Sequence, residues 1–203
     1  MSSAITPDVV GYTEILEESP MTPQELQRKV ELETIFKSAD LSKDEQRLIQ
    51  GKALIQICRE KLYRGNDGGR SWDEYLKQDS HNLTVNNESI KPVTSHKLRA
   101  FYMIRCEIFP KLHTCEVLPT ISHAGELLGY LPAPSKTPDK YNDEDLGKIK
   151  KTINIWKAAC GKSGVNKLPS FTTVRDLAYE QRALDQRTRP RINTIEQSVE
   201  TPK

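Results

Sequence analysis

The chain has few apolar side chains and no long apolar run. Hydrophobic residues make up 36% of its 203 residues, and charged residues make up 29%. Because no run of 18 apolar residues occurs, the sequence predicts no membrane-spanning helix. The first residues carry Asp8 and no basic side chain, which argues against a secretory signal. The low apolar fraction also argues against a compact fold over the whole length, so we expect polar tails or long linkers.

Cysteines are few, and none of them form a recognisable motif. The chain has four, and no two of them form a CxxC pair. We therefore expect neither a structural zinc site nor a redox motif, and a reduced cytoplasmic protein with no metal or other cofactor.

The motifs of common catalytic sites are also missing. The sequence has no GxSxG turn, no phosphate-binding Walker loop and no GxGxxG, and its histidines stand outside any HExxH arrangement. The acidic residues 143–145 fall at an expected helix N-terminus, where the helix dipole favours negative charge, with a metal site as the alternative interpretation. The sequence therefore predicts that the protein is not an enzyme.

What the sequence does contain is an uneven distribution of charge. Over the whole chain, 30 basic and 28 acidic residues leave a net charge of +2. Residues 1–40 hold 3 basic and 8 acidic residues, a net of −5, and the remainder holds 27 and 20, a net of +7. This excludes a uniformly cationic, histone-like protein. It leaves nucleic-acid binding open, because that depends on local charge.

Apolar residues at helical spacing, with capping residues before them, predict seven helices and no strand. Residues 79–93 are polar and predict a loop. We expect an all-α domain over residues 21–180, between a disordered acidic head (1–20) and a flexible C-terminal tail (181–203). The seven helices are expected over 22–39, 42–64, 71–78, 94–109, 119–131, 142–159 and from 172 onward.

Two of these helices have the pattern of a DNA-reading helix. Such a helix carries short polar and basic side chains in its first turns and apolar residues on its opposite face. The helix from residue 94 has this pattern, with Leu98 and Phe101 on the apolar face. The helix from residue 119 places hydroxyl and imidazole groups at its N-terminus, where they can donate to phosphates. The alternative is that both are ordinary amphipathic helices with capping residues.

The order of several short motifs adds a resemblance to known families. The segment Gly51–Arg64, ending in Leu-Tyr-Arg, and then Trp72–Leu76 resemble a family of bacterial plasmid and phage proteins. The continuation is similar to the helical DNA-binding part of ParB-type partition proteins. It is carried by Leu118-Pro119, Ile121–Ala124, Leu127-Leu128, Trp156–Ala159 and Thr172–Leu177. The family implies a multi-helix helix-turn-helix domain. This chain departs from it in the long insert at 79–93 and in lacking the N-terminal arginine box, so no CTP-dependent clamp is implied.

From these features we expect a sequence-specific DNA-binding adaptor. It would be a plasmid or phage partition (centromere-binding) protein or an autoregulatory repressor, associated with the nucleoid or a plasmid in a bacterial cytoplasm. We expect a homodimer on double-stranded DNA. The expected DNA-contacting residues are Thr94, Ser95, His96, Lys97, Arg99, Tyr102, Arg105, Thr120, Ser122, His123, Lys150 and Lys151.

Two alternatives remain beside this expectation. We expect the C-terminal tail to recruit a partition ATPase or a filament protein, and the alternative is that the tail has no partner. The whole chain would be a helical protein-interaction scaffold if it never touches DNA.

Overall fold

A computed structural model of the chain shows seven α-helices and one minimal strand pair in the residues that it describes. The helices are α1 (Pro23–Lys37), α2 (Lys43–Arg59), α3 (Trp72–Gln78), α4 (Pro92–Tyr102), α5 (Ile121–Leu127), α6 (Asp143–Ser163) and α7 (Phe171–Thr188). The strands β1 (Thr84–Val85) and β2 (Glu88–Ser89) are two residues each and pair antiparallel. The described residues are 19–37, 43–65, 68–78, 84–85, 88–89, 91–111, 117–164 and 167–188.

The prediction of an all-helical protein is confirmed over those ranges, apart from the short strand pair. Among the described helices, none is both long and apolar enough to cross a lipid bilayer. Most of the predicted acidic head, residues 1–18, and the end of the predicted tail, residues 189–203, lie outside the described part of the chain.

Capping boxes start two of the helices where the sequence predicted them. The Thr22 amide donates to the Glu25 carboxylate at 2.8 Å, and the Glu25 amide donates to the Thr22 hydroxyl at 3.2 Å. Ser71 and Glu74 make the same reciprocal pair at 2.8 and 3.3 Å. Each box satisfies two backbone N–H groups that a helix start otherwise leaves without an acceptor.

Several helix boundaries differ from the prediction, among them those of α2, α4, α6 and α7. Helix α2 ends at Arg59, because Lys61 has a φ of +53°, which interrupts a right-handed helix. Helix α4 starts at Pro92 rather than at residue 94, because proline suits the first helical position, where no N–H is needed. Helix α6 runs on to Ser163 before Gly164, whose φ of +92° ends it. Helix α7 continues to Thr188, so the helical domain extends past residue 180.

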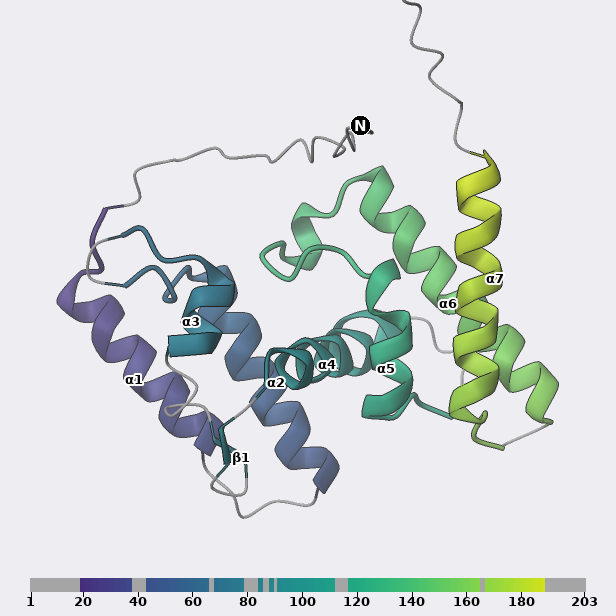
Figure 1. Cartoon of the computed structure of the whole chain (residues 1–203), viewed down its shortest axis with the longest axis horizontal. Helices are drawn as coiled ribbons and strands as arrows, with labels where there is room; N and C mark the ends of the chain where they lie inside the picture. The colour runs from purple at the N-terminus through teal and green to yellow at the C-terminus, as the bar shows by residue number, and fades with distance from the viewer. Residues whose placement is uncertain are drawn as a thin grey trace, which may run out of the picture.

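Helix α4 lies at the centre of the molecule, with α1, α2 and α3 on one side of it and α5, α6 and α7 on the other (Figure 1). The chain stays helical beyond Tyr102, the last residue of α4. A π-helical segment, Met103–Ile108, and a 3₁₀ turn, Phe109–Lys111, continue it. The result is one long helical rod through the middle of the fold.

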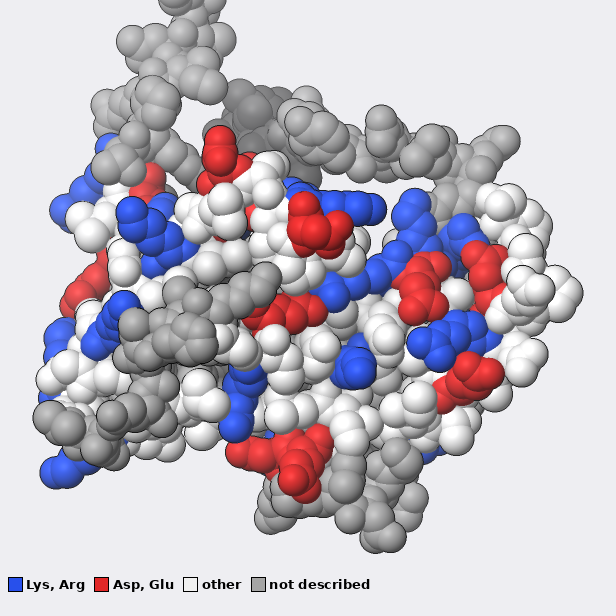
Figure 2. Space-filling model, turned by 180° about the vertical axis from the view of Figure 1, so that it is seen from behind, with Lys and Arg blue, Asp and Glu red and all other residues white. Residues whose placement is uncertain are grey.

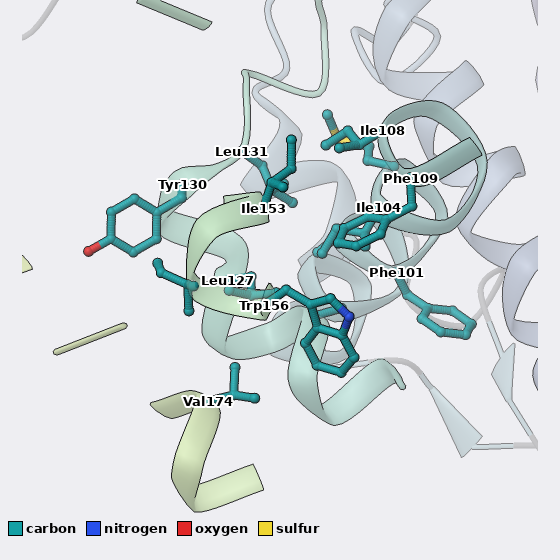
Figure 3. Packing of buried hydrophobic residues seen from close by; sticks show 14 of the residues in the cluster. Phe101, Ile104, Ile108, Phe109, Leu127, Tyr130, Leu131, Ile153, Trp156 and Val174 are labelled. Atoms are coloured by element: carbon teal, nitrogen blue, oxygen red, sulfur yellow. The ribbon is translucent and has the colours of Figure 1, made fainter. Parts of the chain in front are cut away.

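Two hydrophobic cores form on the two sides of this rod. The N-terminal core holds residues of α1, α2 and α3, and the C-terminal core holds residues of the rod's second half and of α5, α6 and α7 (Figure 3). Helix α4 contributes Leu98 to the first and Phe101 to the second, and both side chains are buried. Each core packs against α4, so the second half of α4 is held from both sides.

The crossing of α2 over α4 depends on Gly51. A Cβ atom at this position would lie 2.4 Å from the Leu98 carbonyl oxygen and 2.8 Å from the Tyr102 Cβ. Only a residue without a side chain allows such a close approach of the two backbones. The glycine of the Gly51–Arg64 motif therefore fixes how close α2 and α4 lie.

Candidate nucleic-acid interface

The first turn of α4 is the part of this helix that faces solvent. Lys91, Pro92 and Val93 are exposed, and Val93 is 64% exposed, the largest value among the exposed large hydrophobic side chains of the described residues. His96 and Lys97 follow and are half-buried. The turn is closed by the Thr94 and Ser95 amides, which donate to the Lys91 carbonyl at 2.8 and 3.1 Å. An open helix start is thus attached to a helix whose remainder is buried.

Two residues expected to read DNA from this helix are inside the protein instead. Ser95 is buried, and its hydroxyl donates to the Pro92 carbonyl at 2.8 Å. Arg99 is 5% exposed, and its guanidinium stacks 4.8 Å from the centre of the Trp72 ring. Both face the side of α4 on which α2 and α3 pack. Ser95 and Arg99 are thus buried within the protein, and their expected direct contact with DNA stays a prediction that this burial does not favour.

His96 connects the buried and the exposed parts of the helix start. Its Nδ1 forms a hydrogen bond with the Nη2 of Arg99. Burial lowers the pKa of His96, the positive charge of Arg99 lowers it further, and Asp73 on α3 opposes the change. These effects together favour the neutral imidazole.

Lys97 lies against α5. Its Cγ and Cε atoms would be only 3.1 and 3.0 Å from a Cβ placed on Gly125. The missing side chain of Gly125 leaves room for the lysine stem to lie on α5. Long basic side chains bury their methylene stem in this way while the charged end stays in water.

The start of α5, the second predicted DNA-reading element, has a structural role. His123 is 4% exposed, and its Nδ1 accepts from the Thr120 amide at 3.2 Å. Its Nε2 lies 3.1 Å from the Pro169 carbonyl, and its ring lies 5.3 Å from that of Trp156. Burial lowers the pKa of His123, although the Pro169 carbonyl partly opposes this.

The structure gives Thr120 and His123 a role within the protein, and their expected contact with phosphates stays a prediction. These residues form a capping box that ties α5 to the segment before α7. Of the three residues predicted here, only Ser122 is exposed.

Tyr102 and Arg105 lie away from the exposed helix start. They are about 13 Å or more from Val93 along the helix axis, at 1.5 Å per residue. Tyr102 is half-buried, and its Cβ faces Gly51 of α2. Arg105 pairs with Asp44 at 3.3 Å. The structure does not bring these two residues together with His96 and Lys97.

The lysines of α6 divide into two groups. Lys151 donates to Asp185 at 2.7 Å, and Lys148 pairs with Glu144 at the same distance. Lys150, Lys157 and Lys162 are exposed and have no ion pair with any described residue. On the face opposite to that of Figure 1, basic and acidic side chains are interspersed (Figure 2). Lys150 thus remains open to a phosphate, whereas Lys151 is engaged within the protein.

The acidic residues at the start of α6 are engaged as well. Asp145 is buried, accepts from the Asn142 amide at 3.2 Å and accepts from Lys136 at 2.6 Å. The lysine and the cap hold the pKa of Asp145 below its ordinary value. Over the described ranges, no group of three potential metal-ligating side chains is found.

Sequence reasoning missed Lys91 and Val93 of the exposed start of α4, and Gly125 of α5, which packs against Lys97. The signal for the first two was Pro92, which marks a first helical position. Reading the helix from Pro92 would have placed Val93 on its first turn. No signal in the sequence identified Gly125, because its role depends on the packing of α5 against α4.

Comparisons with protein-family models, with curated proteins and with solved structures found no match to this chain. The functional argument therefore rests on the placement of its own side chains.

Proposed function

We propose that the chain is a sequence-specific protein that binds double-stranded DNA and inserts the first turn of α4 into the major groove. The observation that carries the proposal is the contrast within α4. Its second half is held by two cores, whereas in its first two turns Val93 is exposed and His96 and Lys97 are half-buried near the surface. A rigidly held helix with an open N-terminal turn suits a reading helix, because base contacts come from its first residues.

The chemistry of the exposed residues fits the two tasks of such a helix. Lys91, Lys97 and the positive end of the helix dipole suit the phosphates that position a protein on the duplex. Val93 suits the methyl group of thymine, which is an apolar feature of the major groove. His96 suits a hydrogen-bond acceptor on a base edge.

Helix α3 provides the support that a helix-turn-helix unit requires. Trp72, its first residue, covers the buried Arg99 of α4. We propose α3 and α4 as the two helices of this unit, with the strand pair β1–β2 lying between them in the sequence. Lys150 of α6 is proposed as an additional phosphate contact.

The cellular role follows from the resemblance to ParB-type and plasmid or phage proteins. We propose a partition (centromere-binding) protein or an autoregulatory repressor that is associated with the nucleoid or a plasmid in a bacterial cytoplasm. It would bind paired half-sites as a homodimer. The segment after α7 is proposed to bind a partition ATPase or a filament protein.

The test compares two charge-reversed proteins on the same DNA. Duplexes are first selected by the full chain from a random pool. Lys91→Glu with Lys97→Glu should lower affinity about 100-fold and reduce the slope of log affinity against log salt by about two, one for each lost phosphate contact. Lys52→Glu with Lys140→Glu is the matched control, because both lysines are exposed and have no ion pair with a described residue.

Two results would contradict the proposal. If the pool yields no enriched duplex, the chain does not read DNA. If both double variants weaken binding equally, the contact is non-specific attraction rather than the first turn of α4.

One observation favours a second function, a helical protein-interaction scaffold. Exposed large apolar side chains gather along and just before α7, at Leu168, Phe171, Tyr179 and Leu184. Such side chains are typical of contacts with another protein. Absence of any gel shift with the selected pool at low and high salt would favour this function over DNA binding.

A further inference from the structure

Arg99 is a buried cation at a position where an apolar side chain would serve the packing of the core equally well. It is 5% exposed and has no ion pair with a carboxylate in the described residues. Apart from His96, it contacts the Trp72 ring and the Cys58 sulfur, 3.9 Å from Nη1, and its Nε has no hydrogen-bond partner. Asp73 interacts with it electrostatically without forming an ion pair. Burying a guanidinium is costly, and an apolar side chain would fill the same space at lower cost. A specific task would explain why an arginine stands here.

The contact with His96 indicates that task. A guanidinium only donates hydrogen bonds, so the Nδ1 atom that meets Arg99 Nη2 must be the acceptor. The neutral imidazole then carries its proton on Nε2. In histidine, the partner of one ring nitrogen sets the state of the other.

The Nε2 atom of His96 is available to an external ligand. It makes no hydrogen bond to any described residue, and it is not one of the buried polar atoms that lack a partner. It is therefore open to solvent. His96 lies in the exposed start of α4, between Val93 and Lys97.

The charges around His96 favour the neutral ring. Arg99 of α4 adds a positive charge beside it and Asp73 of α3 a negative one, while burial disfavours the imidazolium. The pKa of His96 is lowered by these effects together. An uncharged N–H donor suits an acceptor on a base edge, such as N7 of a purine, better than it suits a phosphate.

We propose that Arg99 is a positioning residue that holds His96 in its Nε2–H form, so that the ring presents a fixed, uncharged hydrogen-bond donor to a purine N7 atom in the major groove. Arg99 then acts on DNA through His96 rather than by contact. The DNA part rests on the proposed function, whereas the state of the ring does not.

The first experiment measures the ring without DNA. ¹⁵N NMR of the full chain should show His96 with the proton on Nε2 and a lowered pKa. Arg99→Met keeps a long stem but removes the donor, so it should give a mixture of both tautomers and a raised pKa for His96. Arg99→Gln retains an N–H donor and should restore the Nε2–H form in part.

Cys58→Ala is the control for packing, because it removes a neighbour of Arg99 without removing the donor to His96. It should leave the tautomer unchanged. An Nδ1–H form in the unmodified chain would overturn the proposal. So would an identical tautomer mixture in the Arg99→Met and the unmodified proteins.

The second experiment asks whether DNA uses the donor. In a selected duplex, 7-deazapurines are substituted one at a time, which removes only N7. One position should weaken binding about ten-fold, the usual effect of one hydrogen bond. His96→Ala should lose sensitivity at that position alone. Arg99→Met should bind more weakly at pH 8 and recover affinity as the pH falls, because a protonated His96 carries N–H on both ring nitrogens and so regains the Nε2–H donor.

The outcomes separate the two proposals. If no position responds to the loss of N7 although the duplex binds, DNA does not use the donor of His96, and this inference fails while the proposed function stands. If no duplex binds at all, the proposed function fails and the presentation to DNA fails with it. The NMR result then still decides the role of Arg99 within the protein.

Discussion

The starts of α4 and α5 are built from the same residue types and have opposite roles. Each has a threonine, a serine and a histidine near its N-terminus. In α5, the ring of His123 turns back to Thr120 and is closed off by the Pro169 carbonyl. In α4, the ring of His96 turns to Arg99 and leaves one nitrogen open to solvent. The histidine at the start of α5 is therefore buried, whereas the histidine at the start of α4 keeps one ring nitrogen accessible to solvent.

The difference comes from the position of each histidine relative to its helix start. His123 is the third residue of α5, the position whose side chain reaches back to the N-cap. His96 is the fifth residue of α4, two positions further along, because Pro92 takes the first position. It therefore cannot cap its own helix. Composition alone does not separate a capping histidine from a presented one, whereas the helix register does.

Removing His123 should have the largest effect on stability. His123→Ala loses a cap, the contact with the Pro169 carbonyl and packing against Trp156. It should lower the free energy of unfolding by about 2 to 3 kcal/mol. His96→Ala should lower it by less than about 1 kcal/mol, because half-exposed sites contribute less. Urea unfolding of the two variants measures this, and equal losses would contradict the comparison.

For DNA binding we expect the opposite order, with the larger loss of affinity at His96 and the smaller at His123. His96→Ala should weaken binding to a selected duplex about ten-fold, since one hydrogen bond is lost. His123→Gln, which can still accept from the Thr120 amide, should leave the affinity within about two-fold below its unfolding temperature. Fluorescence anisotropy with labelled duplex gives both values. A larger loss in His123→Gln would place α5 in the interface.

Stability should fall as the pH drops below about 6.5, the ordinary histidine value. Both His96 and His123 have lowered pKa values in the folded protein. Between the lowered and the ordinary value, the unfolded chain binds a proton that the folded chain does not, so lower pH favours unfolding. His123→Gln should remove much of this dependence. Urea midpoints at pH 7.5 and pH 5.5 test it, and an unchanged dependence in the variant would contradict it.

Gly125→Ala should give the smallest effect. The new methyl group meets the stem of Lys97 at about 3 Å, so the lysine must move. Affinity for DNA should fall about two- to three-fold. The stability should change by less than about 1 kcal/mol, because alanine favours the helix while the contact opposes it. The same substitution with Lys97→Ala already present should have no further effect on binding.

Local signals in the sequence predicted the helices and several of their first residues. Thr22 with Glu25 and Ser71 with Glu74 act within four residues of chain, so no distant partner is needed to interpret them. The start of α4 was predicted two residues late, because Thr94 and Ser95 also resemble capping residues. Proline at the first helical position was the better signal.

The roles of the candidate site residues were decided by tertiary structure. Arginine is a residue type that commonly contacts DNA. Arg99, however, is covered by Cys58 of α2 and Trp72 of α3, which come from distant parts of the chain. Gly125 has no pattern around it, and only the position of Lys97 gives it a role.

The sequence by itself determined that the protein is helical, where two of its capping boxes lie and that a basic body follows an acidic head. These depend on residues a few positions apart or on simple composition. Which face of α4 is buried depends on how α2, α3 and α5 pack on it, and helical periodicity does not contain that information. The tertiary structure alone therefore decided that His96 lies near the surface and that the buried Arg99 contacts its ring.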